Sequence, residues 1–89
     1  MKAPDYLLKA AAIMEERVKQ YDSPQGERSM EDTITAFNAI TGYQLTEANG
    51  WLLLALLKMV RDNKNEAHED SCLDLVAYAA LYAEARLCS

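Results

Sequence analysis

Residues 51–60 read WLLLALLKMV, and this stretch decides the fold. Every residue in it except Lys58 is apolar, so a helix through it must be buried on most sides. In a chain of 89 residues, such a helix is either central in the domain or meets a second chain. The uninterrupted apolar run, Trp51–Leu57, is much shorter than the roughly 20 residues of a membrane span. We therefore expect it to form core.

Caps and apolar spacing around this stretch predict four helices. They are expected over residues 4–20, 29–40, 46–62 and 71–87. Ser29 with Asp32 resembles a capping box, Thr46 suits an N-cap, and Gly42 suits the left-handed position after a helix. Short connections favour antiparallel neighbours. We expect one all-α domain over residues 1–89, a small bundle of about four helices with short antiparallel connections.

Composition supports this fold class and restricts the partners. The chain is 51% apolar with three glycines and two prolines, which favours helices over a sandwich or barrel. The formal net charge of -5 does not favour direct nucleic-acid binding, which requires cations to neutralise phosphates. It suits a protein in solution, or one that meets a basic partner surface.

The cysteines and the N-terminus indicate a cytoplasmic protein. If Cys72 and Cys88 lie on one helix, they are about 24 Å apart, whereas a disulfide needs Cα atoms within roughly 7 Å. They cannot pair within the chain, which suits a reducing compartment. Met1–Asp5 has no apolar signal-peptide segment, and we expect no membrane association.

Residues 68–74 read HEDSCLD, which gathers an imidazole, three carboxylates, a hydroxyl and a thiol. One interpretation is the start of a helix, where negative charge is favourable. Asp70 or Ser71 would then be the N-cap, and Asp74 would complete a capping box with Ser71. This interpretation does not require His68.

The other interpretation is a binding site. Asp70 and Asp74 are four residues apart and suit Mg²⁺, which binds through one or two carboxylates. Lys58 and Arg61 share a side of the preceding helix, so a phosphorylated small molecule could lie between these groups. The same contacts could form a structural salt-bridge cluster, which is the more frequent outcome. If Lys58 is half buried, it needs an acidic partner, for which Asp74 or Glu84 is suitable.

Three further residues complete the candidate set. His68 could act as a base if Asp70 orients it, although a lone loop histidine is usually solvated or caps something. Tyr21, after Arg17, could line a pocket that stacks a base, although such a pair more often covers the end of a bundle. No residue can be assigned as catalytic.

The order of these motifs resembles a group of small phage- and prophage-encoded proteins. The pattern covers about residues 17–84 and reads Arg17…Tyr21-x-Ser23-Pro24, Leu56-Leu57-Lys58-x-x-Arg61 and His68-x-Asp70-Ser71-x-x-Asp74-x-x-x-Tyr78-x-x-Leu81-x-x-Glu84. The chain is more faintly similar to MazG-like all-α nucleotide pyrophosphohydrolases, in which paired acidic motifs bind Mg²⁺. Asp74 matches the Asp of their Glu-x-x-Asp motif, Ser71 stands in place of the Glu, and their Glu-x-x-Glu motif has no clean match.

Together these features predict a cytosolic phage-type protein that binds, and in the hydrolase case cleaves, a phosphorylated nucleotide between the last two helices. The ligand would contact Arg17, Tyr21, Lys58, Arg61 and His68, and Mg²⁺ would contact Asp70 and Asp74. The alternative is a non-catalytic acidic interaction module that inhibits a host enzyme or an anti-phage defence complex in the host cytoplasm. The apolar stretch at 51–60 also predicts a homo-oligomer.

Overall fold

The computed structural model describes residues 1–20, 29–64 and 66–88. For residues 18–20 it describes the backbone but not the side chains. Four α-helices occupy these ranges: α1 (Ala3–Gln20), α2 (Met30–Thr41), α3 (Glu47–Lys64) and α4 (Glu69–Leu87). None of the described residues lies in a strand, so the all-α prediction is confirmed. The observed ends lie close to the expected ones because turn and cap residues mark them locally.

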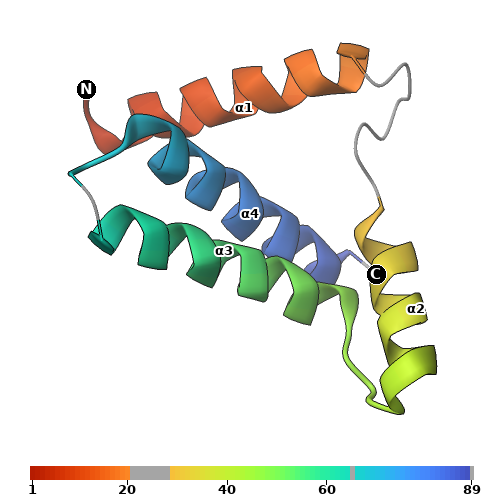
Figure 1. Cartoon of the computed structure of the whole chain (residues 1–89). Helices are drawn as coiled ribbons and strands as arrows, with labels where there is room; N and C mark the ends of the chain where they lie inside the picture. Colours follow the sequence, from red (N-terminus) through yellow and green to blue (C-terminus); the bar gives the residue numbers. More distant parts are fainter. Residues whose placement is uncertain (21–28, 65, 89) are drawn as a thin grey trace.

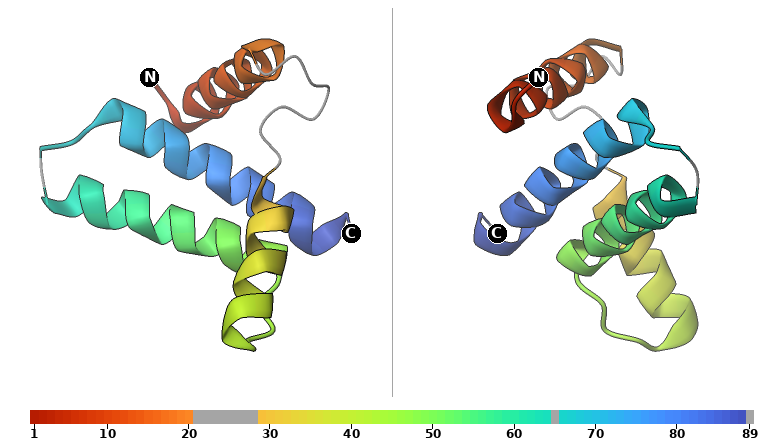
Figure 2. Two further views of the ribbon diagram at one scale, coloured as in Figure 1. Left: turned by 45° about the vertical axis from the view of Figure 1, so that its right-hand side comes forward. Right: turned by 90° about the vertical axis from the view of Figure 1, so that its left-hand side faces the viewer.

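The helices form one layer with α2 at its end. α3 and α4 form an antiparallel hairpin, and α1 lies across the opposite side of α4 (Figure 1). α2 contacts α3, and within the described residues it packs against neither α1 nor α4. Figure 2 shows the same order from two further directions. The antiparallel arrangement expected of sequence neighbours is therefore formed by α3 and α4, and not by α1 and α2.

The buried core is small and consists mainly of alanine. In the described residues its apolar members are Ala10, Ala48, Trp51, Ala55, Leu73 and Ala77. Alanines let helices approach closely, but each removes less apolar area from water than a larger side chain. Trp51 is the large member: it is 5% exposed and stacks on Tyr78 of α4, with ring centroids 5.9 Å apart. The α3–α4 contact is therefore the centre of the fold.

Hydrogen bonds fix the connection between α2 and α3. Gly42 has a φ of 80°, the predicted left-handed conformation, and its N–H donates to the Asn38 carbonyl at 2.8 Å. The Asn38 side chain also donates to and accepts from the backbone of Leu45. Thr46 Oγ1 accepts from the Asn49 N–H, and Asn49 Oδ1 accepts from the Thr46 N–H. The predicted Thr46 N-cap is therefore confirmed as a reciprocal capping box.

The start of α2 differs from the prediction. Ser29 has a helical backbone conformation and makes no side-chain cap hydrogen bond, so the capping box expected with Asp32 is wrong. α2 contacts α3 through Met30, whose thioether occupies the space that a Cβ at Gly50 would need. Gly50 thus permits this close contact, while α2 itself has no buried residue.

Candidate functional site

Three of the candidate residues meet at Asp74, on the side of α4. Lys58 Nζ of α3 lies 3.0 Å from Asp74 Oδ2, and Arg17 Nη2 of α1 lies 3.6 Å from Asp74 Oδ1. The Lys58 side chain is 16% exposed and that of Asp74 is 23% exposed, so this pair is largely removed from water. The expectation that a half-buried Lys58 pairs with an acid is confirmed, with Asp74 as the acid. One carboxylate therefore joins α1, α3 and α4.

His68 is the N-cap of α4, so the prediction of Asp70 or Ser71 as the cap is wrong. The His68 backbone is extended, and its Nδ1 accepts from the Ser71 N–H at 3.3 Å. Nδ1 also lies 3.0 Å from Ser71 Oγ, and the His68 N–H donates to Asp62 Oδ1 at 3.0 Å. The His68 ring nitrogen thus accepts the backbone N–H bond that a hydroxyl or carboxylate oxygen usually accepts at an N-cap. The imidazole is thus held by the local helix start.

The two candidate metal ligands, Asp70 and Asp74, have different surroundings. Asp74 is paired with two cations, whereas Asp70 is exposed in the first turn of α4. Beside it, Glu69 pairs with Lys9 of α1, and the hydrogen bond and charge of Glu69 raise the pKa of Lys9. The charge of Asp70 adds to this shift. In the part of the chain that the structure describes, no three His, Cys, Asp or Glu residues gather as a metal site.

The remaining candidates lie around this cluster or outside the described residues. Arg61 is exposed one turn after Lys58 on α3. Tyr21 falls outside the described residues, so its expected role stays a prediction. Burial raises the pKa of the Cys72 thiol, and the nearby charge of Asp62 raises it further. A raised pKa leaves less thiolate, which makes Cys72 a poor nucleophile at neutral pH.

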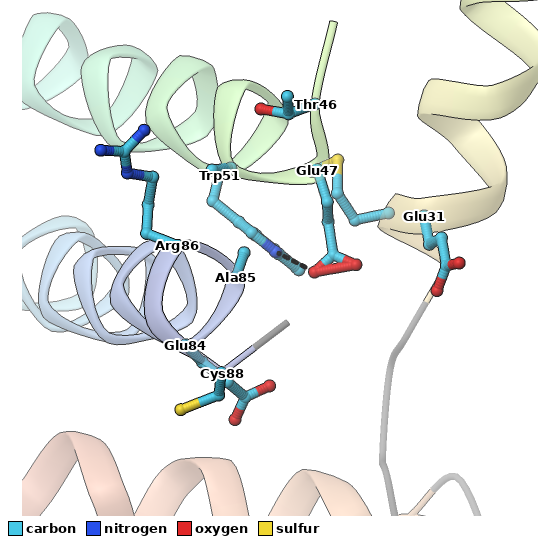
Figure 3. A pocket seen from close by; sticks show the side chains of 10 residues that line it. Glu31, Thr46, Glu47, Trp51, Glu84, Ala85, Arg86 and Cys88 are labelled. Atoms are coloured by element: carbon cyan, nitrogen blue, oxygen red, sulfur yellow. Dashed lines mark hydrogen bonds between the residues drawn. The ribbon is translucent and has the colours of Figure 1, made fainter.

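An open hollow of about 940 Å³ lies at the other end of the hairpin (Figure 3). It is bounded by the starts of α2 and α3 and by the end of α4, and the described candidate residues do not line it. Its lining includes Glu31, Trp51, Glu84 and Arg86. The sequence did not point to it because it depends on how α2 packs. The sequence holds one weak signal of this hollow, the spacing of four residues between Glu47 and Trp51, which places both on one side of a helix. In the structure the Trp51 Nε1–H donates to Glu47 at 3.3 Å.

The side of α3 that faces away from α4 is apolar and exposed. Six side chains cover it, each 40–67% exposed: Leu52, Leu53, Leu56, Leu57, Met59 and Val60. At 100° per residue they span about 160° of the helix circumference. In Figure 1 no described helix packs along this side of α3, and α2 lies only beside its start. We call these six residues the α3 outer face.

The fold and the site define a small all-α protein. Its charged candidate residues form ion pairs between helices, and one side of α3 is apolar and exposed to solvent. The sequence matches the family described as "Domain of unknown function (DUF6378)" over residues 6–86, so the chain belongs to that family. No curated protein and no solved structure shows a significant match to it. Within the described ranges, no helix combines the length and apolar content needed to cross a membrane.

Proposed function

We propose that this protein is a non-catalytic interaction module that acts by contact with protein surfaces. The observation that carries the proposal is the α3 outer face, whose side chains are 40–67% exposed. Soluble monomers rarely expose contiguous apolar patches larger than a few hundred Å², and larger patches commonly mark contact sites. A partner surface at this face would take the place that another helix occupies in a closed bundle.

The pairing of the charged candidates supports a structural role for them. Lys58 and Arg17 both contact Asp74, so this carboxylate is engaged by cations from two other helices. A largely buried charge is costly unless it is paired, which explains the contact without a ligand. His68 is likewise engaged, since its Nδ1 accepts from the Ser71 N–H.

Charge suggests what kind of protein is attracted. A net charge of -5 steers basic surfaces toward the molecule over long distances, while the apolar face supplies contact area. If the resemblance to phage-encoded proteins reflects the origin of the chain, the steered partner is a host enzyme or defence complex that binding would inhibit. The acidic surface and the α3 outer face then have separate tasks.

A capture experiment with paired variants tests this proposal. Immobilised wild type, Leu53→Arg and Leu8→Arg are exposed to an extract of the cells that contain the protein. A specific partner should be retained by the wild type and by Leu8→Arg, and lost with Leu53→Arg, since only Leu53 belongs to the α3 outer face. Equal retention by all three baits would contradict the proposal, because a charge at the face would then have no effect.

A second candidate function is the binding of a phosphorylated nucleotide at the Asp74 cluster. The observation that favours it is the meeting of two cations, Arg17 and Lys58, at one carboxylate, which leaves a net positive charge there. Arg17 is about half exposed, so its guanidinium can exchange Asp74 for a phosphate.

Thermal unfolding with a nucleotide panel, with and without Mg²⁺, tests this candidate. A ligand at 100 times its Kd adds about 2.7 kcal/mol of stability, which raises the Tm of a domain this size by about 10 °C or more. Arg17→Ala should abolish the shift if the cluster is the site. The absence of a shift with every nucleotide would remove the candidate.

A further inference from the structure

We infer that the α3 outer face binds a second copy of this chain. In this arrangement two α3 helices pair antiparallel about a two-fold axis near Leu56. The inference rests on the proposed function, because it names the occupant of the same surface.

The chain exposes more surface than a compact monomer of its mass. The accessible surface of the chain is 6790 Å², whereas a folded monomer of 10.0 kDa exposes about 5,200 Å². The radius of gyration is 14.1 Å, compared with about 12 Å for a compact domain of 89 residues. The difference of about 1,500 Å² belongs to the chain as a whole, and the six side chains of the α3 outer face, each 40–67% exposed, contribute part of it.

A second copy would also complete the core. The buried apolar residues in the described ranges are four alanines, one leucine and one tryptophan, while the leucines of the α3 outer face lie at the surface. Pairing two α3 helices would bury these leucines between the two copies and add to the core that each α3 already forms with its own α4. Chains of this size whose own core is small commonly obtain the rest by oligomerisation.

Five of the six side chains of the α3 outer face have a counterpart on the same face about Leu56, whereas Leu57 would lie opposite the buried Ala55. The α3 outer face runs from Leu52 to Val60, so its midpoint is Leu56. Antiparallel pairing about Leu56 places Leu52 of one copy opposite Val60 of the second, and Leu53 opposite Met59. A two-fold contact requires such a match of one surface with itself.

The charges favour a second copy over a basic protein at this face. Lys58, the one charged residue of the apolar stretch, is turned toward Asp74 on α4. A basic partner would therefore find no carboxylate on the α3 outer face, whereas an identical apolar face needs none. α3 begins with Glu47 and carries Arg61 and Lys64 in its last turn. Antiparallel pairing opposes the two helix dipoles, which is favourable.

Mass measurement by light scattering and sedimentation tests the inference. The wild type should have twice the 10.0 kDa mass of the chain, and its Tm should rise with protein concentration. Leu53→Arg should weaken dimerisation by at least about 100-fold, because each contact then buries two unpaired cations. Leu8→Arg is the matched control: Leu8 of α1 is 70% exposed and Leu53 is 67% exposed, but Leu8 lies outside the face.

The outcomes separate this inference from the proposed function. A folded, monomeric wild type with a concentration-independent Tm overturns the dimer and leaves the interaction proposal to the capture experiment. A Leu53→Arg variant that stays as dimeric as the wild type overturns the assignment of the face. Loss of the dimer with Leu8→Arg alone does the same.

A disulfide experiment keeps the inference testable if Leu53→Arg does not fold. Leu56→Cys, in a Cys88→Ser background, places a thiol at the two-fold axis, where it meets its own copy. Mild oxidation should then give a covalent dimer, and Leu8→Cys in the same background should not. A dimeric wild type combined with no covalent dimer from Leu56→Cys overturns the proposed geometry.

Discussion

Trp51→Ala is expected to lower the free energy of unfolding by about 3–5 kcal/mol. Trp51 is the largest buried side chain among the described core residues and stacks on Tyr78 at 5.9 Å. Its removal leaves a cavity between α3 and α4 and ends the hydrogen bond to Glu47. A domain of 89 residues has a total stability of roughly 4–13 kcal/mol, so the variant should be partly or largely unfolded at 25 °C.

Urea unfolding followed by circular dichroism, at one fixed protein concentration, measures this effect. Tyr43→Ala serves as the control, because Tyr43 is an exposed aromatic residue on the connection between α2 and α3. The control should cost about 1 kcal/mol at most, because the Tyr43 ring is mostly exposed, although it lies beside that of Phe37 with centroids 6.1 Å apart. Equal losses in the two variants would show that the α3–α4 contact around Trp51 is not the centre of the fold.

Asp74→Ala is expected to lower the free energy of unfolding by about 1–3 kcal/mol. The change leaves Lys58 without a carboxylate although its side chain is only 16% exposed, and it leaves Arg17 as a second cation nearby. Lys58→Met should cost less, because Asp74 keeps Arg17. The double variant should be more stable than the sum of the single losses predicts, with an interaction energy of about 0.5–3 kcal/mol.

The Lys9–Glu69 pair is the built-in control for this cycle. It also connects a lysine to α4, but both of its side chains are about half exposed. Lys9→Met should therefore leave the stability almost unchanged, since exposed pairs contribute little. Equal losses from Lys9→Met and Lys58→Met would contradict a structural role for the Asp74 cluster. An unchanged stability of Lys58→Met together with loss of nucleotide binding would instead favour the binding site.

The helices could be predicted from the sequence because local chemistry sets their ends. Gly42 has the left-handed conformation and Thr46 forms the cap that their residue types favour. His68 was missed as the N-cap of α4 because an imidazole seldom has this role. The capping box at Ser29 failed because Ser29 has a helical rather than an extended backbone.

The candidate cluster could be predicted only in part. Residue spacing placed Lys58 near the end of its helix and Asp74 near the start of the next, and the two meet. The contact of Arg17 with Asp74 depends on how α1 crosses α4, which spacing within one helix does not determine. The same limit applies to Asp70, which lies beside the Lys9–Glu69 pair of α1 and α4.

The packing of α3 shows what an apolar pattern alone leaves open. The pattern at 51–60 required either a central helix or contact with a second chain. Within the described residues, α3 packs against α4 on one side and against α2 at its start, and its outer face is uncovered. Whether another helix covers the outer face depends on the direction of α2, which no local signal in the sequence specifies.

Methionine oxidation measures whether the α3 outer face is covered in solution. Met59 lies on this face and is 51% exposed in the single chain, and Met1, outside the face, is 65% exposed. The two thioethers should therefore react with dilute peroxide at comparable rates if the chain is monomeric. We predict that Met59 reacts much more slowly than Met1, and that its protection increases with protein concentration. Comparable oxidation of Met59 and Met1 at every concentration would contradict the pairing of two α3 helices.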